Sequence, residues 1–212
     1  NLEMIKILIS HPRIDINLKS TVSEIPKNIA NLNNFKEIIE KTTPLYESII
    51  IDDINIAKLL LDNGINVNQK SIIKTKKHEY KETALHYSIR NKKDPFVKLL
   101  LSHEKIDVNK PSEIKEGNDK YIETPLYLSV RENDFEMVKL LLKQPKIDVN
   151  ILSTNISNDK KYKETALNLA IRKSYYEIAQ LLLKHSDINI NTIMTIENKE
   201  YLSKNKTKEQ II

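Results

Sequence analysis

Histidine and carboxylate side chains are the residues of this chain that could hold a metal or transfer a proton. The chain has five histidines and no cysteine. His11, His103 and His185 each stand two positions after the last apolar residue of a recurring block, so they belong to separate, equivalent units. Packed helices lie about 8–10 Å apart, which is too far for such histidines to share a metal at bond lengths of about 2 Å. HExxH and GxSxG motifs are absent. We therefore expect no catalytic residue, no metal site and no cofactor.

Arginine has a more informative distribution. Three of the four arginines recur at intervals of 41 residues; they are Arg90, Arg131 and Arg172. A guanidinium group can bind carboxylates through two parallel hydrogen bonds, so this row suits an acidic segment of a partner protein. A cation near a helix end also satisfies the last carbonyls and the helix dipole. Both interpretations predict the recurrence, and the sequence leaves them open.

Tyrosines and lysines form two further candidate groups. Three tyrosines stand three residues before a recurring threonine; they are Tyr80, Tyr121 and Tyr162. They are either an aromatic stripe that meets a partner or a ladder of packed rings, and the large area that aromatics bury favours the ladder. Positive charge is concentrated in the stretch 69–81, which includes Lys74, Lys76 and Lys77. Charged stretches are more often solvated loops than binding sites.

The elements that position these residues recur as three blocks in phase. The first block begins with threonine at 43, 83, 124 and 165, at steps of 40 or 41 residues. The second block is rich in leucine and spans 55–61, 95–101, 136–142 and 177–183. The third block ends in asparagine and spans 65–68, 106–109, 147–150 and 188–191. Such a period indicates a stack of similar structural units.

Each unit is typical of two short helices followed by an extended connector. Threonine or Thr-Pro at the start of the first block suits a helix N-terminus, where a hydroxyl caps and proline loses no hydrogen bond. Leu85, Ser88 and Ile89 share one helical face. Helices this short are marginal alone, so stacking of the units must bury them.

At these blocks the sequence resembles the ankyrin-repeat family. Thr124-Pro125-Leu126-Tyr127, residues 137–142 and Asp148-Val149-Asn150 match its consensus elements. The resemblance implies an all-α fold, an ankyrin-repeat solenoid of stacked helix pairs with long β-hairpin fingers. It also implies a protein–protein interaction scaffold without enzymatic activity, which binds a partner through its concave face and finger tips.

Two departures from the family pattern concern the connectors. The family repeat has 33 residues, whereas this one has 40 or 41. From the last asparagine of a unit to the next threonine is 15 residues each time. The turn glycine of the family is replaced by Lys81, Ile122 and Lys163. We therefore expect longer fingers with a different turn.

The domain organisation follows from the register of the blocks. We predict one array over 1–191, with a partial repeat at 1–17, a degenerate repeat at 24–41 and repeats starting near 43, 83, 124 and 165. Residues 192–212 form a tail, a last finger or the start of a truncated repeat.

Composition excludes several classes of protein. Hydrophobic residues make up 40% of the 212 and charged residues 30%, and no apolar run approaches the length of a membrane span. The two glycines rule out a glycine-rich phosphate loop. With a net charge of +5, the alternative function is binding of nucleic acid or another polyanion through the basic finger at 69–81. Nucleic acid is less favoured because the tips lack interleaved aromatics. We expect a cytoplasmic monomer, with the nucleus left open.

Overall fold

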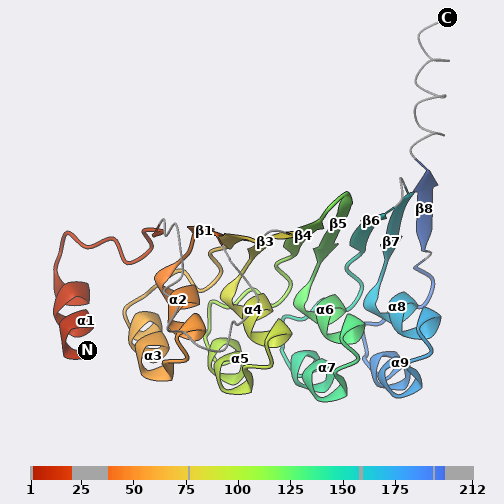
Figure 1. The fold of residues 1–212 in the computed structure, drawn as a ribbon. Helices are drawn as coiled ribbons and strands as arrows, with labels where there is room; N and C mark the ends of the chain where they lie inside the picture. Colours follow the sequence, from red (N-terminus) through yellow and green to blue (C-terminus); the bar gives the residue numbers. More distant parts are fainter. Residues whose placement is uncertain (1, 21–37, 76, 158–159, 193, 199–212) are drawn as a thin grey trace, which may run out of the picture.

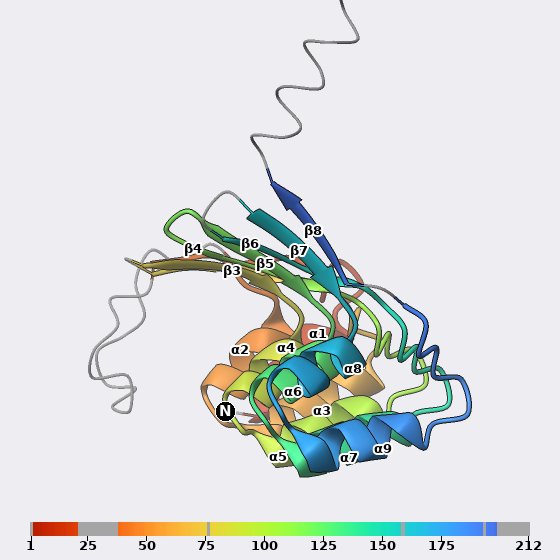
Figure 2. The same ribbon diagram turned by 90° about the vertical axis from the view of Figure 1, so that its right-hand side faces the viewer.

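The computed structural model describes residues 2–20, 38–75, 77–157, 160–192 and 194–198. Within these residues the helices come in pairs that stack side by side along the chain (Figure 1). The first helix of each pair lies nearer the sheet than the second (Figure 2). The first helices are α2 (Pro44–Ile50), α4 (Ala84–Arg90), α6 (Pro125–Arg131) and α8 (Ala166–Arg172). The second helices are α3 (Ile54–Asp62), α5 (Asp94–Leu101), α7 (Phe135–Leu142) and α9 (Tyr176–Leu183), and α1 (Leu2–Ser10) precedes them.

Every first helix begins at a threonine, as the sequence predicts. The hydroxyls of Thr43, Thr83, Thr124 and Thr165 accept hydrogen bonds from the backbone N–H three residues later, at 3.2 to 3.5 Å. Pro44 and Pro125 occupy the first helical position. The cap satisfies an amide that the helix itself leaves unpaired.

The turn between the helices of each pair contains one residue in the left-handed region. Its φ lies between 53° and 61°, and the four residues are Asp52, Lys92, Asn133 and Ser174. This conformation turns the chain sharply enough to bring the second helix back along the first, at a steric cost for residues other than glycine.

The prediction of an all-α fold is wrong, because the connectors form an eight-stranded antiparallel sheet. Figure 2 shows this sheet above the first helices. Its strands pair in sequence order, within each finger and between neighbouring fingers. They are β1 (Ile38–Lys41), β2 (Ser71–Lys74), β3 (His78–Glu82), β4 (Ser112–Glu116), β5 (Asp119–Glu123), β6 (Ser153–Ser157), β7 (Lys160–Glu164) and β8 (Thr195–Asn198).

The length of the connectors explains the sheet. Fifteen residues accommodate two strands of four or five residues, so each finger offers hydrogen-bonding edges to both neighbours. Burial alternates along β2 as it does on a sheet with one covered face. In β2, Ser71 and Ile73 are buried, whereas Ile72 and Lys74 are half-buried. At one tip, Gly117 adopts a φ of +57° in the two-residue turn between β4 and β5.

The N-terminal part of the array departs from the regular repeats. Residues 38–41, the end of the predicted degenerate repeat, form strand β1. Its remainder, 24–37, lies outside the described residues. Ser20 forms an antiparallel bridge with Thr42, at the place where Ser71 pairs with Glu82 in the next finger. In the predicted tail, Thr195–Asn198 pair with β7 as a strand, while 199–212 lie outside the described residues.

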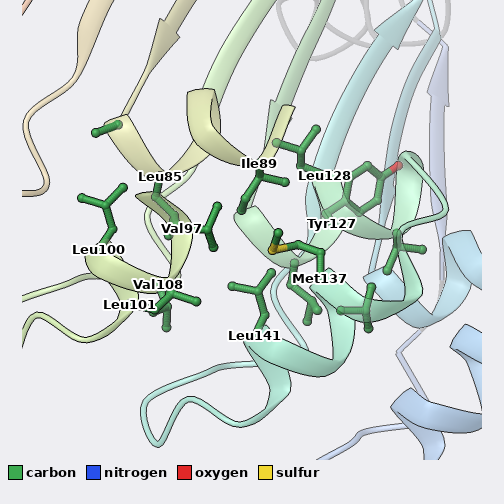
Figure 3. Packing of buried hydrophobic residues seen from close by; sticks show 14 of the residues in the cluster. Leu85, Ile89, Val97, Leu100, Leu101, Val108, Tyr127, Leu128, Met137 and Leu141 are labelled. Carbon is green, nitrogen blue, oxygen red and sulfur yellow. The ribbon is translucent and has the colours of Figure 1, made fainter. Parts of the chain in front are cut away.

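One apolar cluster runs continuously through the stack. Val97 and Leu100 of α5, and Val138 and Leu141 of α7, are at most 1% exposed. Figure 3 shows side chains of neighbouring repeats meeting between the helices. Each second helix is therefore buried by its own partner helix and by the adjacent repeats.

The asparagine that ends each repeat joins it to the next. Asn109 donates from Nδ2 to the carbonyl of Lys146 at 2.7 Å and accepts at Oδ1 from the N–H of Asp148 at 2.9 Å. The equivalent residues Asn68 and Asn150 make the same two bonds. Two hydrogen bonds from one side chain fix the spacing of adjacent loops.

Leu141→Ala tests the central position of the core. We expect it to lower the free energy of unfolding by about 2–5 kcal/mol, because it removes a fully buried side chain and leaves a cavity. Urea denaturation followed by circular dichroism measures the change. Leu183→Ala is the matched control, since Leu183 is 49% exposed at the end of the equivalent helix. A loss below about 1 kcal/mol for Leu141→Ala would contradict this assignment of the core.

Candidate partner-binding surface

The three arginines of the row end the first helices α4, α6 and α8, and each faces a carboxylate of its own repeat. Arg131 donates from Nε and Nη2 to the two carboxylate oxygens of Glu123, both at 3.0 Å. Arg172 bonds to Glu164 in the same way, at 3.1 and 2.5 Å. Arg90 bonds to Glu82 through Nη2. These ion pairs are a third role, beside the two interpretations that the sequence left open.

The carboxylates of these pairs are buried at the end of a strand. Glu82, Glu123 and Glu164 are 1–2% exposed and stand immediately before the capping threonine. Burial raises the pKa of Glu123, and the facing guanidinium of Arg131 opposes this shift. Burial lowers the pKa of Arg131, but the Glu123 carboxylate outweighs it and raises the pKa above its ordinary value. Each charge therefore keeps its partner ionised.

A side chain of the preceding repeat reaches the same place. The hydroxyl of Tyr46 donates to Glu82 at 2.7 Å, and that of Tyr127 donates to Glu164 at 2.8 Å. Burial together with the nearby carboxylate raises the pKa of both tyrosines. The buried ion pairs of the second and fourth complete repeats are thus also links between repeats.

His86 takes the equivalent position in the second complete repeat. Its Nε2 lies 3.3 Å from the carbonyl of Glu123, and its Nδ1 lies 2.8 Å from the hydroxyl of Thr83. A carbonyl only accepts, so Nε2 carries a proton. Burial lowers the pKa of His86 to about 3, so the ring is neutral near pH 7. The histidine is a structural link between the second and third complete repeats.

The predicted tyrosines lie on the sheet face that meets the first helices. The guanidinium of Arg90 lies over the ring of Tyr80, 4.1 Å from its centre. Tyr80 and Tyr121 flank Ile114 across the strands, and Tyr121 and Tyr162 flank Asn155. The rings thus alternate with other side chains and do not occupy adjacent strands. We call this surface, formed by the tyrosine and arginine rows, the inner surface.

Two of the three predicted lysines of the basic finger, Lys74 and Lys77, lie near its tip. Lys74 ends β2, Lys77 is exposed in the turn, and Lys76 lies outside the described residues. The opposite, outer face of the sheet carries lysines that pair with glutamates across strands. Lys115 lies 3.3 Å from Glu79, and Lys120 lies 3.1 Å from Glu113. Neighbouring carboxylates therefore compensate part of the positive charge of this face.

Three further histidines, His11, His103 and His185, close the turns after α1, α5 and α9. The Nδ1 atoms of His11, His103 and His185 accept a hydrogen bond from the backbone N–H two residues later, at 3.2 to 3.3 Å. Among the described residues, no group of three histidine or acidic side chains is arranged to hold a metal ion. None of the helices described here has the length and apolar character that crossing a membrane requires.

Comparison with known families agrees with this arrangement. A family model of ankyrin repeats matches the chain in three overlapping copies, over residues 1–112, 71–153 and 111–193. No curated protein matches the chain.

Arg131→Ala tests the buried ion pair. We expect a loss of about 2–3 kcal/mol, below the 3–5 kcal/mol of fully buried pairs because the Arg131 side chain is 35% exposed. Adding Glu123→Gln to this variant removes the unpaired charge and should restore part of the stability. Urea unfolding of both single variants and the double variant measures the coupling. If the loss of unfolding free energy in the double variant equalled the sum of the losses in the two single variants, the result would contradict the ion pair.

His86→Asn tests the neutral histidine, because asparagine already occupies the equivalent position as Asn168. The pKa of His86 is about 3 in the folded chain and about 6.5 when unfolded. Between these values the unfolded chain binds the extra proton, so stability falls as pH falls, by up to about 1.4 kcal/mol per pH unit. The unfolding free energy of the variant, measured between pH 6.5 and 4.5, should fall less steeply. If the unfolding free energies of variant and parent fell equally steeply with pH, His86 would take up its proton equally well in the folded chain. That result would contradict a buried, neutral histidine.

Proposed function

The chain belongs to the ankyrin-repeat family, and on that premise we propose that it binds a protein partner through its inner surface and finger tips, without catalysis. Ankyrin repeats are in general protein–protein interaction modules. The specific proposal is that the partner supplies an extended acidic segment and that Arg90, Arg131 and Arg172 form the central row of contacts.

The orientation of the arginines is the observation that carries this proposal. In Arg131 and Arg172 the edge formed by Nε and Nη2 is held by a buried carboxylate. Since a guanidinium group is planar, the Nη1 edge is turned away from that carboxylate in a fixed direction. In Arg131 this edge already holds an acceptor at the surface, Oε1 of Glu132, at 3.3 Å. A partner carboxylate can bind to the same edge without ordering a flexible side chain first.

Exposure increases along the row toward the C-terminus. The side chains of Arg90, Arg131 and Arg172 are 23%, 35% and 45% exposed. Arg90 is also covered by Tyr80, so it contributes less to binding. We therefore assign the main contacts to Arg131 and Arg172.

The distance between the arginines of adjacent repeats determines which partner segment fits them. Equivalent residues of adjacent repeats lie about 10 Å apart, and an extended chain advances about 3.3 Å per residue. An acidic residue at every third position therefore matches the row. Each arginine is already neutralised by one glutamate, so directed hydrogen bonds contribute more than net charge.

In this proposal the basic finger attracts the partner electrostatically before contact is made. Lys74, Lys76 and Lys77 steer an acidic partner and raise its association rate, with little effect on the lifetime of the complex. The alternative, polyanion binding through 69–81, draws on the same lysines. We rank it second because the net charge of the chain is only +5 and the finger tips lack interleaved aromatic side chains on which bases stack.

Binding of a synthetic peptide to Arg172→Lys tests the proposal. The probe is a twelve-residue peptide with glutamate at every third position, measured by fluorescence anisotropy. Lysine keeps the charge but loses the planar fork, so we expect affinity to fall about fivefold to tenfold. Unfolding should change little, because the Arg172–Glu164 pair is the most exposed of the three.

Lys143→Ala is the control, since it removes a cation at the end of α7, away from the inner surface. A peptide with its glutamates clustered at one end is the control for spacing. Equal affinities for the parent chain and Arg172→Lys, at equal stability, would overturn the proposed role of the row.

A further inference from the structure

Two shallow hollows lie side by side between the second helices α7 and α9. Their volumes are about 410 and 240 Å³, and both are bordered by Phe135 and Glu177, so they form one groove. We call it the aromatic groove, formed by Phe135, Tyr175, Tyr176, Glu177 and Gln180. It lies between two repeats on the second-helix layer, and the turn of residues 173–175 separates Tyr176 from Arg172 at the end of α8.

The aromatic side chains of this groove are not required by the repeat. The first position of the second helix is Ile54, Asp94, Phe135 and Tyr176 in the four complete repeats. The position before it is Asp53, Lys93, Asp134 and Tyr175. Phe135 and Tyr175 pack in part against the core. Since the first two repeats stack without an aromatic residue here, stacking does not require three aromatic residues at this junction, and it does not explain Tyr176. Tyr176 is moreover 75% exposed, which is unusual for so large a ring.

We propose that the aromatic groove binds a proline-rich segment of a partner protein in the polyproline II conformation, with a basic residue beside it. Phe135 and Tyr176 are equivalent residues of adjacent repeats, about 10 Å apart. One turn of polyproline II has three residues and rises about 9.3 Å. Prolines three residues apart therefore meet one ring each, as in other aromatic-lined grooves that bind such segments.

Polar groups around the rings complete the match. The tyrosine hydroxyls and the Gln180 amide supply hydrogen-bond donors for the carbonyls of the segment, which has no internal hydrogen bonds of its own. Glu136 and Glu177 are exposed at equivalent positions, where the earlier repeats have Asn55 and Pro95. Two carboxylates beside the rings complement a basic residue next to the prolines. Lys184 borders only the second hollow, and no cation of the described part of the chain lines the first, which the tyrosines border.

The test uses a labelled synthetic peptide, Arg-Ala-Ala-Pro-Ala-Ala-Pro-Ala, and fluorescence anisotropy with the full chain. We expect saturable binding that weakens about tenfold in Tyr176→Ala and little in Tyr176→Phe, which keeps the ring. Asp94→Ala, at the equivalent position two repeats earlier, should bind like the parent chain. Because Tyr176 is exposed, its removal leaves thermal unfolding unchanged, and loss of binding then reports on the groove alone.

Peptide controls separate the contributions. Replacing both prolines with alanine should abolish binding, and replacing the arginine with glutamate should weaken it severalfold. Arg172→Lys should bind this peptide normally, so this surface and the inner surface succeed or fail independently. Equal binding by the parent chain and Tyr176→Ala, or none by either, would overturn the proposal. Self-association that Tyr176→Ala removes would also overturn it, by making a second copy of the chain the occupant.

Discussion

The burial of a carboxylate at the joint between finger and first helix, in three of the four complete repeats, is the constraint on which the arrangement of the other elements depends. A carboxylate 1–2% exposed is stable there only with a cation and hydrogen-bond donors around it. In the third complete repeat the cation is Arg131, eight residues after Glu123, so the end of strand β5 is tied to the far end of helix α6. This tie fixes the angle between finger and helix pair. Where a tyrosine hydroxyl of the preceding repeat donates to this carboxylate, the carboxylate also fixes how the two repeats stack.

The helices could be predicted from the sequence because their signals are local. Threonine caps, proline at the first helical position and apolar spacing of three and four residues act within a single turn. The family resemblance predicted β-hairpin fingers but not that they join into one sheet, because this pairing links residues far apart along the chain. Strand β6 consists of Ser-Thr-Asn-Ile-Ser, a polar segment of weak strand propensity. It becomes a strand because β5 and β7 present hydrogen-bonding edges on either side. The fixed connector length indicated ordered fingers, but length alone does not show that neighbouring fingers join.

The ion pairs illustrate the same limit for the candidate surface. Sequence reasoning found the arginine row but did not connect it to the glutamates that precede the capping threonines, because a separation of eight residues is not a contact within one helix. Yet the two positions change together between repeats. In the repeat that begins at Thr43, threonine replaces the glutamate as Thr42, and isoleucine replaces the arginine as Ile50. An arginine without a glutamate, or the reverse, does not occur in the four complete repeats. Such joint replacement is the signal that could have identified the pairs without a structure.

Comparison between repeats also shows that the two proposed surfaces are supported by different kinds of observation. The arginines recur because each repeat with a buried glutamate needs one, so recurrence alone says nothing about a partner. Their proposed role depends instead on geometry: a guanidinium group held along one edge directs its other edge outward. The aromatic groove shows the opposite case. Its rings appear at one junction only among the described repeats, at positions where stacking accepts isoleucine, aspartate and lysine elsewhere. A large exposed ring at a position that stability leaves free is therefore better explained by binding than by folding.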